Sequence, residues 1–282
     1  MGAWIANFLS KNGYEVIIND TNRSAARKVA RELHIRFADD QMQALESSQL
    51  VILATPTPIT QTMLLRLTRE DFKDKLFVEI SSVKKPLKTV LRGLKEKGFS
   101  ILSIHPMFGP GARSPKGRAV LVTPLTRKTR LAEEFLATLR KKGARLIKCS
   151  LDEHDKLIAL VLILPHFLNA AFVAGLRALD VDLNLLSKAA GPTFRLQLLL
   201  AEEIHQENLD NETSMLLDNT YSIKTLKKYT QTSNIIANTI ARRNRAIVLR
   251  SLRSGQKFLR EDRQFSSVCS RFNEAALAAS LH

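Results

Sequence analysis

The sequence predicts an α/β domain built on a parallel sheet, followed by an all-helical domain. Up to about residue 150, short β-like runs alternate with helical segments, which is typical of βαβ units. Beyond that point, long segments carry apolar residues at helical spacing and contain few β-branched clusters. The change near Ser150 places one domain at residues 1–150 and the other at residues 151–282.

The expected strands of the first domain are short runs of aliphatic and β-branched residues. They cover 14–20, 49–56, 75–82, 99–106, 119–124 and 144–149. Helical segments follow the first three runs, at 21–34, 58–71 and 85–98, and another lies between the last two, at 127–142. Because near-continuous apolar strands fit a sheet that is covered on both faces, we expect helices on both sides.

The composition is that of an ordinary globular protein, with 45% hydrophobic and 25% charged residues. The longest apolar segment, 157–176, is interrupted by Pro165 and His166, so we expect a buried helix and no membrane span. The first residues lack the basic region and cleavage site of a signal peptide, and we expect a cytoplasmic protein. Cys149 and Cys269 are too few for a disulfide framework or a metal cluster, so no metal is expected.

A net charge of +16 and an isoelectric point near 10.1 raise the question of an anionic partner. The densest basic stretch, 241–262, is interrupted at helical spacing by apolar residues such as Ile247 and Leu252, which is typical of a solvated helix face. Only Tyr221 and Tyr229 lie upstream nearby as aromatic residues that could stack on bases. We therefore do not expect a nucleic-acid partner.

Asp20, Thr55 and Pro56 lie at the ends of expected strands, where open α/β sheets bind ligands. Asp20 either accepts hydrogen bonds from the ribose of a dinucleotide or serves as a helix cap or turn residue. Arg23 nearby could tolerate a 2′-phosphate, which leaves NADP open beside NAD. Thr55 and Pro56 either line the cofactor or form an ordinary strand-to-helix turn.

The usual glycine-rich fingerprint of dinucleotide binding is incomplete. It consists of a strand, then G-x-G-x-x-G, then a helix. This chain opens at Met1-Gly2-Ala3-Trp4, directly in what we interpret as that helix, so Gly2 could be the third glycine. We hypothesise that the first strand and the first two glycines, which let a pyrophosphate approach the backbone, belong to a longer chain upstream of Met1.

His105 closes an expected strand and precedes the rigid turn PMFGPG. It either ends the strand structurally or is presented to a ligand. Ser82 ends the neighbouring strand, and if both ends face one crevice its hydroxyl could bond one imidazole nitrogen and fix the tautomer. The other nitrogen would then be available as a base.

The second domain carries further candidate residues. His154 and His166 lie twelve residues apart on its first helix, roughly 18 Å along the axis, which is too far to share a metal ion. His166 is either a satisfied core residue or a substrate contact. Arg195 begins an apolar helix, where it is either salt-bridged or available to bind a carboxylate in bidentate fashion.

Segments along nearly the whole chain occur in the order and approximate spacing of one family: MGAWIANFL, YEVIIND, VILATP, ISSVKKPL, HPMFGPGA, HD…LPHF and GPTFRLQLLLAEEIHQEN. In these segments the sequence resembles the prephenate dehydrogenases of tyrosine biosynthesis. The resemblance implies a Rossmann-like nicotinamide-binding domain followed by a helical domain that forms a homodimer. It also implies NAD-dependent oxidative decarboxylation of prephenate to 4-hydroxyphenylpyruvate.

The resemblance further implies roles for single residues. His105 matches the histidine that bonds the ring hydroxyl and assists its deprotonation, and Ser82 matches the serine that orients this histidine. His166 and Arg195 match substrate residues of the helical domain, with Arg195 holding a carboxylate. Such a cationic group suits prephenate, which carries two carboxylates.

Three other positions complete the implied site. Lys84 matches a recurring lysine of the SVK motif, which we assign to the substrate side, and Gly2 and Asp20 match the cofactor fingerprint. The chain departs from relatives at Glu212, which falls near an aromatic position and could alter the subunit interface or the edge of the pocket. No chorismate mutase or regulatory domain is visible. An arogenate dehydrogenase and a non-catalytic descendant without a phosphate-binding loop remain alternatives.

Overall fold

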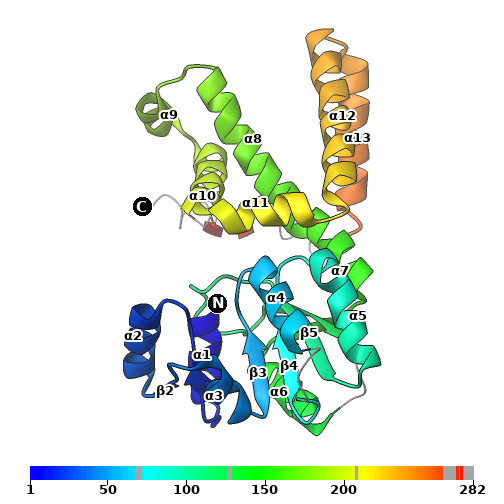
Figure 1. Ribbon diagram of the computed structural model, residues 1–282. Coiled ribbons are helices and arrows are strands. Elements are labelled where there is room, and N and C mark those ends of the chain that lie inside the picture. Colours follow the sequence, from blue (N-terminus) through cyan, green and yellow to red (C-terminus); the bar gives the residue numbers. More distant parts are fainter. Residues whose placement is uncertain (68–71, 126–128, 207–208, 263–270, 273, 276–282) are drawn as a thin grey trace. The chain divides into compact units, whose positions relative to one another are not determined.

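The chain divides into two compact units, Met1–Lys156 and Leu157–His282, which we call the α/β unit and the helical unit. The computed structural model describes residues 1–67, 72–125, 129–206, 209–262, 271–272 and 274–275. Figure 1 shows strands flanked by helices in the α/β unit and only helices in the helical unit. The predicted fold class is confirmed.

The main sheet of the α/β unit has five strands in the order β3-β4-β5-β6-β7. The first three are parallel, but β6 runs antiparallel to β5, and β7 is parallel to β6. The strands are β3 (Leu50–Leu53), β4 (Leu76–Glu79), β5 (Ser100–Pro106), β6 (Ala119–Pro124) and β7 (Arg145–Lys148).

The reversal at β6 corrects the expectation of a wholly parallel sheet. A parallel connection needs a crossover, usually a helix, whereas residues 107–118 contain no helix. This proline- and glycine-containing loop returns the chain beside β5 in the opposite direction, and Pro106 pairs with Val120. The parallel part, β3 to β5, is the part that carries the candidate site.

A separate two-stranded sheet lies near the N-terminus of the chain. It pairs β1 (Ile17–Ile18) with β2 (Arg36–Phe37) in parallel, and α2 (Arg23–Leu33) connects them. Of the strand expected at 14–20, only two residues pair. The sequence patterns missed β2 and the following α3 (Gln41–Glu46), because both are too short to show a periodicity.

Hydrophobic clusters cover both faces of the main sheet. Along β4, Leu76 and Val78 pack in one cluster, whereas Phe77 packs in the other. The first cluster includes residues of α1 and α6, and the second includes residues of α4 and α5. These helices are α1 (Gly2–Ser10), α4 (Thr57–Leu67), α5 (Lys88–Glu96), which follows the 3₁₀ turn η1 (Lys85–Leu87), and α6 (Arg130–Lys141).

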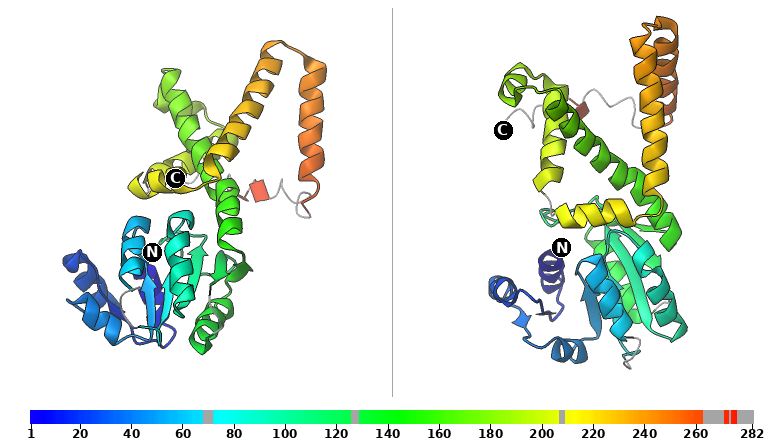
Figure 2. Two further views of the ribbon diagram at one scale, coloured as in Figure 1. Left: turned by 45° about the vertical axis from the view of Figure 1, so that its right-hand side comes forward. Right: turned by 45° about the horizontal axis from the view of Figure 1, so that its top comes forward.

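The first helix of the helical unit begins in the α/β unit, because α7 crosses the boundary at Lys156. Its elements are α7 (Leu151–Ile158), the π-helical turn η2 (Ala159–Ile163), α8 (Leu164–Ala178), α9 (Leu183–Ala189), α10 (Pro192–Gln206), α11 (Leu209–Asp218), α12 (Ser222–Ala241) and α13 (Arg245–Leu259). Figure 2 shows α12 and α13 meeting at their connection and spreading apart away from it. The π turn precedes Pro165, which has no N–H to donate to the carbonyl of Val161.

The helix from Leu151 to Ala178 is more exposed than expected. It is long and apolar enough to cross a membrane by length and composition alone, with a mean hydropathy of 2.3 in its most apolar window. Only 22% of that window is buried, and Leu160 and Val161 are 55% and 54% exposed. The expectation of a buried helix is therefore wrong for the single chain. Counting unbroken apolar runs also missed its length, because Pro165 and His166 interrupt the run without ending the helix.

Candidate active site

Polar side chains gather on one face of the sheet at the carboxyl ends of β4 and β5. Side chains alternate along a strand, so Glu79 lies on the same face as Phe77, and Ser103 and His105 lie on the same face as Ile101. Glu79 is in register with Ser103. This face is thus apolar at one end and polar at the other, where parallel sheets bind ligands.

A buried ion pair joins Lys84 to Glu79 in this polar region. Lys84 Nζ donates to Glu79 Oε1 at 2.7 Å and to the carbonyl oxygen of Ile104 at 2.8 Å. Glu79 also accepts hydrogen bonds from the Ser103 hydroxyl and the Ser81 backbone N–H. Burial lowers the pKa of Lys84, and the Glu79 carboxylate opposes that shift. The structure therefore directs this ammonium group into the interior, where it supports the sheet end and does not present itself to a substrate.

Three buried side chains, His105, His154 and Asp155, form a hydrogen-bonded row that we call the buried triad. His105 Nδ1 lies 3.0 Å from His154 Nε2, and His154 Nδ1 lies 2.8 Å from Asp155 Oδ1. The exposed fractions are 6%, 1% and 3%. Burial holds the pKa of His105 well below its ordinary value, and the charges of His154 and Lys84 act in the same direction. Burial also lowers the pKa of His154, while the Asp155 carboxylate opposes this.

Asp155 also fixes the loop that follows β4. Its Oδ1 accepts the backbone N–H of Lys84 and its Oδ2 accepts that of Lys85, both at 2.9 Å. Ser82 lies half-buried in this loop, and within the described residues no hydrogen bond joins it to His105. The partner that orients the His105 ring in this structure is His154.

This position of His154 beside His105 was not expected from the sequence, in which His154 was considered only as a metal ligand. The available signal was an adjacent histidine and aspartate in the first turns of the helix that follows the last strand. That helix begins with a capping box, in which the Ser150 backbone N–H donates to Glu153 and the Glu153 N–H donates to Ser150 Oγ. His154 lies in the first turn of the helix that this cap begins.

The N-terminus of α1 lies beside the carboxyl end of β3. A Cβ added to Gly2 would lie 3.5 Å from the Cβ of Ala54, which is ordinary contact, so helix and strand pass close together here. Within the described residues no side chain caps α1 at Met1. Its first backbone N–H groups therefore suit an anion such as a phosphate.

Thr55, Pro56 and Asp20 have local partners in turns. Thr55 Oγ1 lies 2.8 Å from Thr60 Oγ1, and the Pro56 carbonyl accepts the Thr60 N–H at 2.9 Å. Asp20 is exposed, and its Oδ1 accepts the N–H of Asn22 at 2.8 Å. Because Asn22 itself caps α2, Asp20 is a turn residue and not the helix cap. A role of its exposed carboxylate toward a ribose stays a prediction.

In the helical unit, His166 on α8 contacts Glu212 on α11. His166 Nδ1 bonds Glu212 Oε2, and the two side chains are 12% and 13% exposed. Arg195 on α10 is half-buried and forms no salt bridge with any residue that the structure describes. A hydrogen bond of 2.6 Å from Gln197 Nε2 to Asn169 Oδ1 joins α10 to α8. His166 is therefore hydrogen-bonded to Glu212, the residue at which the sequence departs from its relatives.

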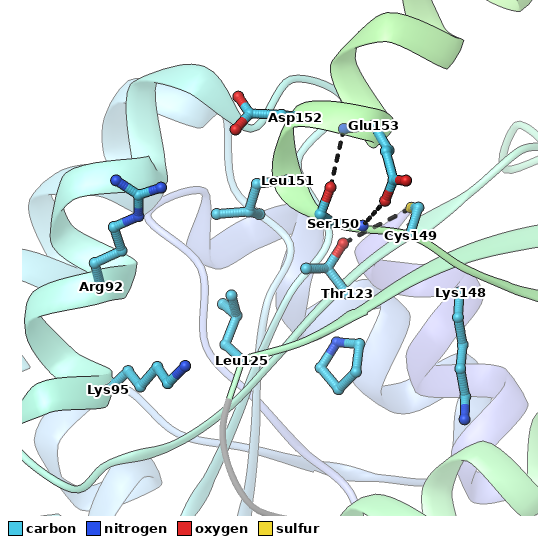
Figure 3. Close-up of a pocket in the computed structure, with 11 residues that line it drawn as sticks. Arg92, Lys95, Thr123, Leu125, Lys148, Cys149, Ser150, Leu151, Asp152 and Glu153 are labelled. Carbon is cyan, nitrogen blue, oxygen red and sulfur yellow. Dashed lines mark hydrogen bonds between the residues drawn. The ribbon is translucent and has the colours of Figure 1, made fainter.

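A surface pocket of about 470 Å³ lies beside the start of α7. Figure 3 shows Arg92 and Lys95 on one side, Lys148 on the other, and the capping residues Ser150 and Glu153 between them. No sequence-predicted site residue lines it. Besides the cap of α7, its lining holds these three basic side chains and the Cys149 thiol.

Two family models match the chain in succession. The model described as "Prephenate dehydrogenase, nucleotide-binding domain" matches residues 5–148, and "Prephenate dehydrogenase, dimerization domain" matches residues 150–254. Together they cover both units of the described fold.

Similar proteins carry related names. A "Probable arogenate/prephenate dehydrogenase" of Methanocaldococcus jannaschii is 28% identical over 211 residues, covering 74% of this chain and 47% of that protein. The "T-protein" of Enterobacter agglomerans is 27% identical over 188 residues, covering 66% of this chain and 49% of that protein. The chain thus spans about half the length of these curated relatives.

Solved structures share the fold. Prephenate dehydrogenase from Aquifex aeolicus superposes with a TM-score of 0.76 at 18% identity, covering 93% of this chain and 96% of that one. The same enzyme in complex with hydroxyphenyl propionate and NAD⁺ gives a TM-score of 0.73 at 20% identity, covering 93% and 94% of the two chains.

Proposed function

Because the chain belongs to the prephenate dehydrogenase family, we propose that it converts prephenate to 4-hydroxyphenylpyruvate with NAD as hydride acceptor. The observation that carries the proposal is the burial and hydrogen bonding of the His105 ring. Its ring is buried at the carboxyl end of β5 and bonded through Nδ1, and Nε2 makes no hydrogen bond to any described residue. We assign cofactor binding to residues 1–150 and substrate contacts and dimerisation to residues 151–282.

For this reaction the protein mainly has to align the substrate with NAD and to accept one proton. As the ring hydroxyl of prephenate becomes a carbonyl, its proton passes to His105 Nε2, and loss of CO₂ then creates an aromatic ring. A buried imidazole suits this task, since burial keeps it neutral before the substrate arrives. General base catalysis of this kind contributes roughly 10²–10⁴-fold.

The residues at the α1 end of the sheet fit a dinucleotide. The uncapped first turn of α1, opened by Gly2, would hold a phosphate, and the exposed Asp20 carboxylate would accept hydrogen bonds from a ribose. Thr55 and Pro56 would line the cofactor with their turn. When bound, NAD would accept the hydride. Arg23, which could tolerate the 2′-phosphate of NADP, is exposed and lies 3.9 Å from the exposed Asp39 carboxylate. The test therefore includes NADP beside NAD.

On the substrate side, the proposal uses Arg195 and His166. The half-buried guanidinium of Arg195 would hold a substrate carboxylate in bidentate fashion. His166, paired with Glu212, would contact the side chain of the substrate. Lys84 is assigned an indirect role, because its ammonium group is committed to Glu79.

Glu212 favours a second candidate substrate. Arogenate carries an ammonium group where prephenate carries a keto oxygen, and a carboxylate close to the substrate would favour the cation. Glu212 is nearly buried and bonds the proposed substrate contact His166. Arogenate oxidation is therefore the alternative activity to test.

Exposed apolar side chains of the helical unit support a homodimer. Large apolar residues are exposed on α9 to α13, such as Leu185, Leu199, Leu217, Ile235 and Phe258. Apolar surface of this extent is typical of an interface. The family model over residues 150–254 is a dimerization domain. We propose that a second copy covers this surface, which also suits a cytoplasmic location better than a membrane one.

The test is NADH formation by the purified chain with NAD and prephenate, with parallel reactions on arogenate and with NADP. Turnover with prephenate and NAD supports the proposal, and turnover only with arogenate replaces the substrate. A folded dimer that is silent in all four reactions would favour a non-catalytic descendant.

A further inference from the structure

We propose that His154 is a positioning residue for the reaction, which together with Asp155 sets the tautomer of His105 and shares the proton that His105 removes. This inference rests on the proposed function of His105 as the base. It is carried by the contacts of the buried triad, 3.0 Å between the two imidazoles and 2.8 Å to the carboxylate. All three side chains lie within the α/β unit.

Counting donors and acceptors assigns each proton in the triad. Asp155 accepts the backbone N–H groups of Lys84 and Lys85 and, as a carboxylate, has no proton to donate. His154 Nδ1 must therefore carry a hydrogen and donate it to Asp155. The neutral His154 then has a bare Nε2, which can only accept, so His105 Nδ1 carries a hydrogen. This leaves His105 Nε2 bare, which is the form that a base requires.

The same row can share a proton during the reaction. The substrate hydroxyl loses a proton, which forms a new N–H bond at His105 Nε2. The N–H at His105 Nδ1 can then move to His154 Nε2, which returns His105 to a neutral ring. The positive charge then lies on His154, directly beside the Asp155 carboxylate. No electrons leave the two rings in these steps, and the hydride passes separately to the cofactor.

The surroundings of His105 favour transfer of the charge to such a partner. A charged His105 would be buried and near the Lys84 ammonium, and both effects disfavour the charge. Burial and the Lys84 charge also lower the pKa of His154, but there the hydrogen bond to Asp155 and the charges of Asp155 and Glu79 oppose them. The second imidazole therefore moves the charge toward the acidic side of the cluster.

A pair of substitutions at His154 tests the role. His154→Leu removes the acceptor, whereas Gln keeps an oxygen that can accept the His105 Nδ1–H. We expect His154→Leu to lower kcat by about 10²-fold, within the range for a positioned base, with KM and NAD affinity nearly unchanged. His154→Gln should retain several-fold more activity. His34→Asn is the matched control, because His34 is exposed and asparagine suits its φ of 53°.

A loss confined to KM, or equal losses in the two variants, would overturn the positioning role. A double variant that combines His154→Leu with His105→Asn gives a second criterion, which does not depend on how far His154→Leu alone lowers kcat. If His154 acts through His105, then adding His154→Leu to His105→Asn costs no further turnover. Multiplying losses in the double variant would show an independent structural effect. The His154→Gln variant serves here if the leucine variant does not fold.

A tautomer measurement separates this inference from the proposed function. Nitrogen-15 NMR of the histidine rings should find the hydrogen of His105 on Nδ1, and His154→Leu should release this preference. The expected tautomer in a protein that turns over no substrate would leave the hydrogen-bond assignment standing and remove the proposed function. Turnover by a protein whose His105 carries its hydrogen on Nε2 would overturn the assignment and leave the activity standing.

Discussion

At the scale of single residues, the proposed reaction requires the buried imidazole of His105 to remain uncharged until a proton arrives from the substrate. Burial supplies this condition by lowering the pKa of His105, and the hydrogen bond to His154 fixes the ring. The sequence around His105 does not show these effects, since the hydrogen bond comes from α7 and a further charge from Lys84 in the loop after β4. The reactive state of the side chain is thus a property of its tertiary neighbours.

Replacing His105 by asparagine should abolish most of the turnover. We expect a loss of about 10²–10⁴-fold in kcat, because asparagine cannot take up the proton. NAD affinity, measured by quenching of the intrinsic fluorescence, should change little, since the expected cofactor residues lie on other loops. Turnover close to that of the His34→Asn control would remove His105 from the catalytic role.

Replacing Arg195 by glutamine should act on substrate binding. Loss of a charge-assisted hydrogen bond is worth about 1.5–3 kcal/mol, so KM should rise roughly 10- to 100-fold while kcat changes less. Initial rates over a range of prephenate concentrations measure both constants. Lys188→Gln, on the exposed side of α9, is the control for loss of one positive charge. An unchanged KM would exclude Arg195 from the substrate site.

The buried histidines also predict how stability depends on pH. An unfolded histidine takes up a proton as the pH falls below its ordinary pKa of 6.5, whereas folded His105 and His154 have lowered pKa values and resist protonation. The free energy of unfolding should therefore fall with pH below 6.5, until the folded-state pKa values are reached. Urea unfolding of wild type and His105→Asn checks this: the stability advantage of wild type should shrink toward acid pH, and a constant difference would contradict it.

At the scale of elements, β4 and β5 each combine an apolar half with a polar carboxyl end on the same face. Phe77 is followed by Glu79 on one strand and Ile101 by Ser103 and His105 on the other. The apolar halves anchor the second hydrophobic cluster, and the polar ends are satisfied by Lys84 and by α7. One strand face thereby serves packing at one end and the proposed chemistry at the other.

The Lys84–Glu79 pair makes this arrangement sensitive to a single change. Lys84→Met leaves the Glu79 carboxylate buried without its cation, which typically costs about 3–5 kcal/mol. Urea unfolding should show this loss, and adding Glu79→Gln should restore part of it because the remaining charge is removed. A loss below about 1 kcal/mol in the single variant would show that the pair contributes little.

The sequence predicts those parts of the fold that depend on patterns between neighbouring residues. The strands β3, β4 and β5 and the helices that follow β3 and β4 are expected from hydrophobic patterning, and the described structure places them within one residue of the predicted ranges. The direction of β6 depends on the absence of a crossover helix in the preceding loop, which patterning did not weigh. The pairing of Lys84 with Glu79 and of His105 with His154 joins residues 5 and 49 positions apart. Such partners require the tertiary fold.

At the scale of the whole molecule, two units divide the proposed work between them. The α/β unit holds the buried triad and the expected cofactor residues, and the helical unit holds Arg195, His166 and the exposed apolar helices. The family models follow the same sequence order. Residue-level chemistry in one unit and association through the other can therefore be altered separately.

A homodimer is the expected state in solution. Light scattering should give about twice the 31.6 kDa of one chain. Ile235→Glu on α12 places a charge on a side chain that is 67% exposed, and should weaken association by at least tenfold, since burying an unpaired charge is costly. Lys227→Glu, an exposed charged position on the same helix, is the control. A monomer at micromolar concentration, or equal effects of both variants, would argue against this interface.

The edge position of β3 has a consequence for the behaviour of the chain outside its native assembly. Among the described residues β3 pairs only with β4, and its sequence LVIL has no charge and no proline. Natural proteins usually protect such an edge with lysine, proline or a bulge. Unprotected backbone of this kind is a template for intermolecular cross-β stacking. This short segment is therefore a place where a further strand, from the same chain or from another molecule, can pair.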